Sequence, residues 1–294
     1  MELISLVLTL RPSKASNPEH PLPERPLPRW WGRAAQALLL DAIRDVDAGL
    51  AAELHDPESE ARPYTVSTLM GPAARERLEP GQDYRLRLTA IRGDVAERLG
   101  AATRAGGKLA PGVPVELDHW PFQIKRVEPD MSVEEHAATG DPPKWTGRTS
   151  YQALSSPFLL ASETPARRVS FLFSSPTTFK SQGRHVPVPM PGLVFGSLLN
   201  RWNEFAPVAF PEEVKQYADE CLAVSRYQLS SRVAEVKAGG RRMGGVGQAT
   251  FTTLNYDRYW MSLIHTLARF ALYSGVGAGT TMGLGQCRML EDRE

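Results

Sequence analysis

The first half of the chain has a pattern of apolar and polar residues that predicts six secondary-structure elements. Apolar runs and strict alternation predict strands, and apolar residues at helical spacing predict helices. The predicted elements are strands over 3–10, 64–70, 84–90 and 120–127, one long helix over 30–54 and a brief helix over 94–99. Their order is β-α-β-β-α-β, the arrangement of a ferredoxin-like domain.

The second half of the chain has the same order of elements without a repeated sequence. Its predicted elements are strands near 169–173 and over 222–236, 246–256 and 285–290, with helices over 193–205 and 258–272. Between the halves, the polar stretch 131–150 contains an Asp-Pro-Pro break and predicts a linker. We therefore predict the α+β class, with two tandem ferredoxin-like domains over 1–135 and 150–294, the second ending in a glycine-rich loop.

The amino-acid composition indicates the class of protein and the compartment in which it works. The chain has 294 residues, 42% of them hydrophobic, enough for two modest domains. Two cysteines are too few for a disulfide framework or a thiolate metal cluster, which favours a reducing compartment. The chain has no basic segment before its first apolar run and no apolar stretch of about eighteen residues. We expect a cytoplasmic protein without a membrane partner.

Charge is unevenly distributed along the sequence. The whole chain carries +1, but residues 167–288 hold 14 Lys or Arg and 7 Asp or Glu, a local balance of +7 against −6 elsewhere. A basic half is compatible with a polyanionic partner. On charge alone, a solvated charged face is the simpler interpretation.

The stretch "GVGAGTTMGLG", residues 275–285, is the most distinctive motif. A phosphate-binding P-loop needs a lysine after its last glycine, and this stretch has none. A dinucleotide-binding loop needs a third glycine where Thr280 stands, and it lies between a strand and a following helix, the reverse of the order predicted here. Glycines allow positive φ and close backbone approach, so successive N–H groups could hold a phosphate or a base edge. The alternative is a tight structural turn, which would need fewer glycines.

The spacing of this loop resembles that of CRISPR-associated endoribonucleases that cut precursor CRISPR RNA within its repeats, members of the RAMP superfamily. Three further stretches resemble the same family, in the family's order: "LAAELHDPESEARPYTVSTLMG", "GQDYRLRLTAI" and "RRVSFLFSSPTTFKSQGRHVPVPMPGLVFGSLLNRWNEFAP". The resemblance implies two ferredoxin-like domains and metal-independent RNA cleavage without a cofactor. In that reaction the RNA 2′-hydroxyl attacks the adjacent phosphorus, leaving a 2′,3′-cyclic phosphate and a 5′-hydroxyl.

The resemblance also implies an RNA-binding set in the second domain. The candidates are Gly275, Gly277, Gly279, Thr280, Thr281, Gly283 and Gly285 in the loop, Lys180, Arg184 and His185 in "KSQGRHVPVP", and Arg241 and Arg242. Family loops often carry a Lys or Arg among the five middle residues, which this loop lacks, so Arg288, Arg241 or Arg242 would have to supply the charge. We expect Gly277→Val or Gly283→Val to weaken RNA binding while the fold survives.

Three residues of the first domain are the catalytic candidates. His55 stands at the end of the first helix, where the family's catalytic histidine lies, and imidazole can serve as base or acid near neutral pH. By itself, a histidine at a helix end is more often a helix-dipole partner. Arg62 could stabilise the pentacovalent phosphate, unless it is ordinary solvated charge. Leu40 stands where some members have a tyrosine, so the second proton-transfer group is Tyr64 or is missing.

Other interpretations stay open. A non-catalytic RAMP-type subunit that binds guide RNA would share the loop and the basic half. A small-molecule enzyme of ferredoxin-like fold would need a closed apolar pocket, of which the sequence gives no sign. CRISPR repeat RNA is the expected partner, and effector-complex subunits and a homodimer are left open. The pairs Trp30–Trp31 and Arg201–Trp202 could stack bases, but anchoring of helices on the core is the preferred interpretation.

Overall fold

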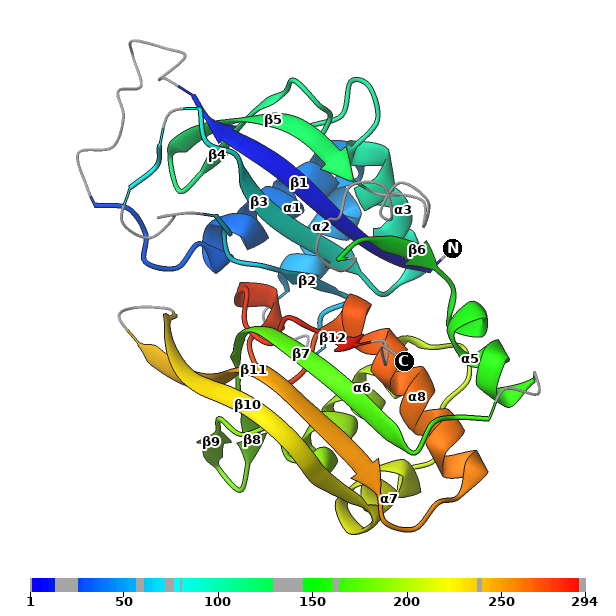
Figure 1. The fold of residues 1–294 in the computed structure, drawn as a ribbon. Coiled ribbons are helices and arrows are strands. Elements are labelled where there is room, and N and C mark those ends of the chain that lie inside the picture. The colour runs from blue at the N-terminus through cyan, green and yellow to red at the C-terminus, as the bar shows by residue number, and fades with distance from the viewer. Residues whose placement is uncertain are drawn as a thin grey trace. The chain divides into compact units, whose positions relative to one another are not determined.

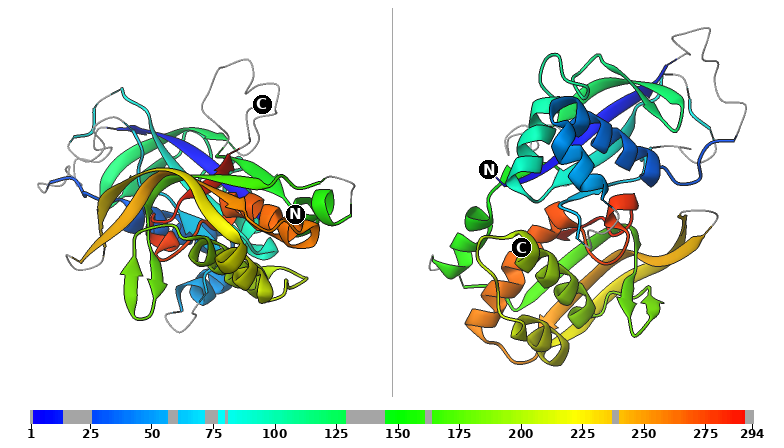
Figure 2. Two further views of the ribbon diagram at one scale, coloured as in Figure 1. Left: turned by 60° about the horizontal axis from the view of Figure 1, so that its bottom comes forward. Right: turned by 180° about the vertical axis from the view of Figure 1, so that it is seen from behind.

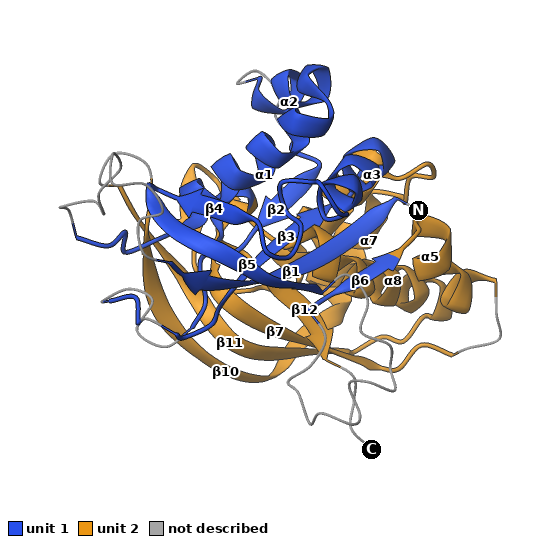
Figure 3. Ribbon diagram, turned by 90° about the horizontal axis from the view of Figure 1, so that it is seen from above, with its two compact units in different colours: residues 1–148, 281–283 blue, residues 149–280, 284–294 orange. Residues whose placement is uncertain are grey.

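The computed structural model describes most of the chain (Figure 1). The described residues are 2–13, 26–56, 61–71, 77–79, 81–128, 145–160, 164–236 and 240–290. The chain divides into two compact units (Figure 3): unit 1 comprises 1–148 and 281–283, and unit 2 comprises 149–280 and 284–294. Most of the predicted linker over 131–150 lies outside the described residues. Its last residues belong to a short strand rather than a linker, β6 (Gly147–Thr149), which pairs with β1.

Unit 1 is an antiparallel sheet with helices on one face (Figure 2). Its further elements are β1 (Leu3–Pro12), α1 (Gly32–Val46), α2 (Ala48–His55), β2 (Tyr64–Val66), β3 (Tyr84–Ala90), α3 (Gly93–Ala102), β4 (Pro114–Leu117) and β5 (Trp120–Glu128). The strands lie in the order β2-β3-β1-β5-β4. The strands predicted from the sequence thus form a ferredoxin-like sheet, in which the first strand lies between the third and the last.

The alternating pattern of β1 and β3 explains their register. Leu6 lies opposite Leu88 and Leu8 opposite Leu86, and all four side chains are fully buried. Because successive residues point to opposite faces, this register puts the apolar set on the helix side. Trp31 packs edge-on against a ring of β5 at 6.0 Å between centroids, which confirms it as a core anchor at the start of α1.

The prediction of one long helix over 30–54 is wrong, because the helix breaks at Asp47. This residue has extended backbone (φ −154°, ψ 95°), and its carboxylate accepts a hydrogen bond from Leu50 N at 3.0 Å and one from Arg98 Nε at 3.3 Å. The bond from Leu50 N, followed by that from Arg98, lowers the pKa of Asp47. An aspartate with this geometry is a preferred helix N-cap, so it starts the separate helix α2.

Unit 2 repeats the arrangement. Its elements are α5 (Tyr151–Leu159), β7 (Arg168–Thr177), β8 (Phe179–Ser181), β9 (Arg184–Val186), α6 (Pro191–Phe205), α7 (Glu213–Cys221), β10 (Leu222–Glu235), β11 (Arg241–Thr253), α8 (Arg258–Ser274) and β12 (Cys287–Leu290). The sheet order β10-β11-β7-β12 again places the first strand between the third and the last. The tandem ferredoxin-like prediction is therefore confirmed, although α5, α7 and the β8–β9 hairpin were not predicted.

The core of unit 2 lies between its sheet and the helices α6 and α8. Phe171 and Phe251 from the sheet meet Phe195 of α6, with ring centroids 5.8 to 6.0 Å apart. Trp202 is 2% exposed and packs on Phe270 of α8, so it is a core anchor as expected. Within the described ranges, no helix is long and apolar enough to cross a membrane.

Candidate functional sites in the two units

The catalytic candidate His55 is the last residue of α2, and its side chain is exposed. The helix is short, so contacts to its surroundings hold it: Leu54 is buried, and Glu53 pairs with Arg92 at 2.8 Å. No described residue hydrogen-bonds to the imidazole of His55. Both ring nitrogens are therefore available to a substrate, as an acid–base group requires.

Arg62 lies at the same end of α2. Its guanidinium donates a hydrogen bond to the carbonyl of Asp56, the residue after His55. Arg62 is partly exposed and forms no ion pair with any residue that the structure describes. Among the described residues, the guanidinium of Arg62 thus lies at the end of α2 that carries His55 and has no carboxylate partner.

Tyr64 has surroundings that disfavour proton transfer to a substrate. It is 0% exposed, and its hydroxyl accepts a hydrogen bond from Gln36 Nε2 at 3.0 Å. Burial raises the pKa of Tyr64, while Gln36 and the positive charge of Arg62 act in the opposite direction. Leu40 is also buried, at 6% exposed. Neither position presents a proton donor or acceptor at the surface, because both side chains belong to the core.

In unit 2, the glycine loop follows α8 and returns to β12. Its five glycines at odd positions, from Gly275 to Gly285, all have φ between +61° and +88°. Two strands of backbone cross within it: Val276 N donates to Gly285 O at 2.9 Å, and a Cβ at Gly285 would lie 2.0 Å from Val276 O. The backbone conformation and the packing of the loop are therefore enough to require glycine, without any ligand.

Gly277 is equally confined. Its N–H donates to Ser197 Oγ at 2.8 Å, and a Cβ would lie 2.4 Å from Thr178 O. The expectation that valine at this position would spare the fold is wrong, because no side chain fits against that carbonyl. The N–H groups of 275–278 and 284–286 all have acceptors within unit 2. A ligand could meet backbone N–H groups only at the tip of the loop, between Gly279 and Gly283.

Residues 281–283 of the tip belong to unit 1 and make contacts there. Trp30 Nε1 donates to Met282 O at 2.6 Å, and a Cβ at Gly32 would lie 1.8 Å from the same oxygen. Gly283 forms a parallel β-bridge with Ser67. Because Met282 and Gly283 make these contacts, a phosphate can reach the loop backbone mainly near Gly279.

Arg201 on α6 holds the base of the loop. It donates to Ser274 O at 2.8 Å and to Thr280 Oγ1 at 2.5 Å. Loss of hydration lowers the pKa of Arg201 to about 10, so the guanidinium stays protonated at neutral pH. Sequence reasoning assigned this residue to the core and missed its contact with the loop, because the two partners are 79 residues apart.

The segment that contains Lys180 and His185 is a β-hairpin, formed by β8 and β9. The two residues lie opposite each other, and Gln182 and Gly183 form a tight turn with φ of +48° and +74°. Thr178 connects the hairpin to the glycine loop, because its carbonyl accepts from Ala278 N at 2.8 Å and its hydroxyl donates to the carbonyl of β9's last residue at 3.2 Å.

A basic cluster lies at this junction, formed by Lys180, His185 and Arg242, whereas the exposed Arg184 faces the other side of the hairpin from His185. A Cβ at Gly279 would lie 3.6 Å from Arg242 Nη1, so this guanidinium is at the tip of the loop. Partial burial, then the positive charges of Arg242 and Lys180, lower the pKa of His185. Within the described part of the chain, Lys180, Arg184 and Arg242 form no ion pair, so their charge is open to an anion.

Two other cations named from the sequence have different positions. Arg241 is exposed but lies on the opposite strand face from Arg242, since neighbouring residues of a strand alternate. Arg288 is 8% exposed and donates to the carbonyl of Met289. Of the three arginines proposed to supply charge to the loop, the structure places Arg242 at the tip.

Comparison with known proteins points to one family. The family described as "CRISPR-associated endoribonuclease Cas6" matches residues 171–287. A Cas6 of Mycobacterium tuberculosis is 33% identical over 135 residues, 45% of this chain and 41% of that protein. A Cas6 of Streptococcus thermophilus is 28% identical over 127 residues, 42% of this chain and 51% of that protein. The match thus spans about half or less of each curated relative.

A solved Cas6 structure, a product complex, extends the likeness to the whole chain. It has 25% sequence identity and a TM-score of 0.73, and the match covers 99% of this chain and 100% of that one. The chain is thus similar to Cas6 proteins in sequence over part of its length and in fold over nearly all of it.

The Cas6 family match covers the two candidate sites unequally. Residues 171–287 run from β7 to β12 and include the basic cluster, Arg201 and the glycine loop. His55, Arg62 and Tyr64 lie outside that segment. In the described residues of this chain, no three His, Cys, Asp or Glu side chains gather as metal ligands would.

Proposed function

We propose that this protein is an endoribonuclease that binds CRISPR repeat RNA and cuts it to produce guide RNAs. The observation that carries the proposal is the whole-chain likeness to a Cas6 product complex, at 25% identity and a TM-score of 0.73. The basic cluster beside the glycine loop supports it, because its cations, which form no ion pair with a described residue, suit the phosphates of RNA.

His55 is the proposed acid–base group. Its imidazole removes the proton of the 2′-hydroxyl as the oxygen attacks the adjacent phosphorus, and the bond from phosphorus to the 5′-oxygen breaks. The imidazolium can return the proton to that leaving oxygen, so the protons balance over one turnover. Products are a 2′,3′-cyclic phosphate and a 5′-hydroxyl. The exposed position of His55 and its lack of described hydrogen-bond partners support this role.

Arg62 is proposed to stabilise the charge that develops on the pentacovalent phosphate. A guanidinium can hold two phosphate oxygens at once, and it stays protonated throughout the reaction. Its bond to the carbonyl of Asp56 keeps it at the end of α2. Because Tyr64 and Leu40 are buried, we propose that His55 acts with electrostatic help and without a second proton-transfer side chain from these positions.

RNA binding is proposed to centre on the basic cluster and the accessible part of the loop near Gly279. Lys180, Arg184 and Arg242 would meet phosphates, and a phosphate bound beside His185 would oppose the loss of hydration and the neighbouring positive charges that lower the pKa of His185. These contacts would set affinity and position, whereas His55 would set the rate.

A second candidate function is a non-catalytic RNA-binding subunit. The burial of Tyr64 favours it, because His55 would then have no help in proton transfer from the other position that the sequence suggested. It would retain tight RNA binding and show no cleavage.

The test is single-turnover cleavage of a repeat RNA in excess chelator, with protein saturating. Wild-type protein should cut the RNA and leave a cyclic phosphate end. Binding without cleavage would support the non-catalytic subunit, and loss of both would remove the proposal. Cleavage that requires added metal would contradict the mechanism.

A further inference from the structure

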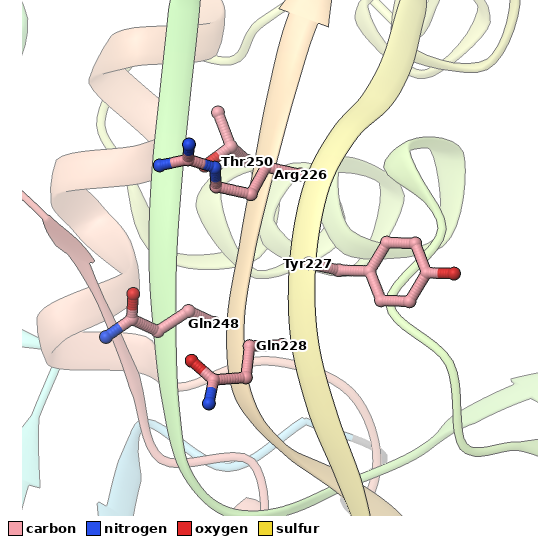
Figure 4. A pocket seen from close by; sticks show the side chains of 5 residues that line it. All are labelled: Arg226, Tyr227, Gln228, Gln248 and Thr250. Atoms are coloured by element: carbon pink, nitrogen blue, oxygen red, sulfur yellow. The ribbon is translucent and has the colours of Figure 1, made fainter.

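A polar hollow lies on the sheet of unit 2, on the face away from its helices (Figure 4). The hollow has a volume of about 450 Å³ and is lined by Arg226, Tyr227, Gln228, Gln248 and Thr250. Four of these side chains stand together on the sheet face, whereas Tyr227 extends away from them at the edge strand. The alternating residues Ala249 and Phe251 are buried on the helix side.

The register of β10 and β11 builds this surface in pairs. Gln228 lies directly opposite Gln248, and Arg226 directly opposite Thr250. Side chains that face each other across two strands are about 5 Å apart at Cβ, so the two amides can contact one ligand group together. Neither amide hydrogen-bonds to any residue that the structure describes. Donors and acceptors of both glutamines are thus presented to a ligand.

Positive charge extends along the same face. Arg232 follows Arg226 by six residues on β10, and because the offset is even, both side chains point the same way. At about 3.3 Å per residue, the Cα atoms of the two arginines are about 20 Å apart along the strand. Both residues are exposed, and neither forms an ion pair within the described segments. The one carboxylate of β10, Glu235, is at an odd offset and faces the other side.

We propose that this polar sheet face, formed by Arg226, Gln228, Arg232, Gln248 and Thr250, holds an unpaired segment of the bound repeat RNA. The two arginines contact phosphates, and the paired amides contact the edge of an unstacked base in the hollow. The inference rests on the proposed function and adds RNA contacts on the sheet of unit 2 to those of the basic cluster, whose Arg242 is at an even offset from Gln248 on β11 and so faces the same side.

Single-stranded RNA fits this surface better than duplex. Amide groups can read a base only when its edge is exposed, and the bases of an A-form helix are hidden in a deep, narrow groove. The volume of the hollow lies in the range of pockets that hold one small-molecule-sized group, such as a nucleotide. A row of cations with neutral polar side chains between them follows a phosphate backbone.

The test compares two double variants that remove the same charge. Arg226→Gln with Arg232→Gln alters the polar sheet face, and Arg258→Gln with Lys215→Gln alters exposed positions on the helices of unit 2. Affinities for the repeat RNA, for a short oligouridine and for duplex RNA of equal length are measured as salt is varied. Each phosphate contact on a single strand contributes a slope of about 0.7 in log K against log salt.

The first variant should bind the repeat RNA and oligouridine about 25-fold more weakly at 0.1 M salt, with a slope about 1.4 shallower. The helix-side variant should keep the wild-type slope. Gln228→Ala with Gln248→Ala should weaken both single-stranded interactions without changing the slope, because no charge is lost.

The inference is overturned if the sheet-face variant (Arg226→Gln with Arg232→Gln) and the helix-side variant give the same salt slopes. It is also overturned if the sheet-face variant loses affinity for duplex RNA and keeps its affinity for oligouridine. These outcomes differ from a failure of the proposed function. In that case wild-type protein itself would not bind or cut the repeat RNA, whatever the sheet variants did.

Discussion

Alanine at different glycines of the loop should separate the structural frame from the part that meets RNA. Gly279 and Gly285 both have positive φ, +80° and +66°. An L residue in this region costs about 1–2 kcal/mol, and about 0.4–1 kcal/mol is recovered because alanine restricts the unfolded chain. At Gly279 the nearest atoms to a Cβ are side-chain ends, Leu284 Cδ1 at 3.3 Å and Arg242 Nη1 at 3.6 Å, which can move. Gly279→Ala should therefore cost about 1 kcal/mol of unfolding free energy.

Gly285→Ala has a second cost that Gly279→Ala lacks. Its Cβ would lie 2.0 Å from Val276 O, so the backbone must move and the hydrogen bond from Val276 N to Gly285 O is strained or lost. A lost bond adds about 0.5–1.5 kcal/mol, and an oxygen left buried adds about 1–3 kcal/mol. The expected destabilisation of unit 2 is about 3 kcal/mol or more.

Thermal unfolding and RNA affinity should respond in opposite order. With about 2–4 °C of Tm per kcal/mol, Gly279→Ala should lower Tm by about 3 °C and Gly285→Ala by about 9 °C. Hydrogen exchange over α8 and β12 shows whether the loss is in unit 2. At a temperature where both variants are folded, Gly279→Ala should weaken binding of the repeat RNA more than Gly285→Ala does, because only Gly279 stands at the tip beside Arg242.

Equal Tm values of the two variants would refute the structural role of Gly285, since the 2.0 Å approach of its Cβ to Val276 O would then cost no stability. Unchanged RNA affinity of Gly279→Ala would remove the tip from the RNA-binding surface and leave the loop a structural turn.

Three further variants test single groups. His55→Ala should slow single-turnover cleavage by about 10²–10⁴-fold with RNA affinity nearly unchanged, and His119→Ala, an exposed histidine in a turn, is the matched control; an unchanged rate would exclude His55. Tyr64→Phe removes the acceptor of the bond from Gln36 and should lower the unfolding free energy by about 1 kcal/mol with cleavage unchanged, so a tenfold slower rate would restore Tyr64 as a candidate. Arg201→Met leaves Ser274 O and Thr280 Oγ1 without their donor and should lower both Tm and RNA affinity, whereas Arg201→Lys should recover part of each. An unaltered Tm of Arg201→Met would show that these two hydrogen bonds do not support the loop.

Periodicity in the sequence was sufficient to predict most of the regular elements. The alternation from Tyr84 to Ala90 became β3 with the same bounds, and the helical pattern from Arg258 became α8. Such patterns are local consequences of burying one face of an element, so they can be read without knowing its neighbours. The order of the elements then restricted the topology to the ferredoxin-like type, since few arrangements satisfy short connections and a common core.

The break at Asp47 and the β8–β9 hairpin escaped prediction for local reasons. Apolar spacing continues across Asp47, so the cap is visible only in the bond from Leu50 N to its carboxylate. The hairpin strands have three residues each, too few for a period to register. Short elements depend on the contacts they make more than on their own pattern.

The chain's own residues named the motifs of the candidate sites, but only the tertiary structure decided what surrounds them. Tyr64 became a core residue because α1 covers it and supplies Gln36. Arg242 lies at the loop because strand alternation and the path of β11 put its guanidinium near Gly279. These outcomes depend on contacts between residues far apart in the chain, whose partners are set by strand register and helix packing. A local pattern encodes which face of an element is buried, but not which side chain of another element meets it.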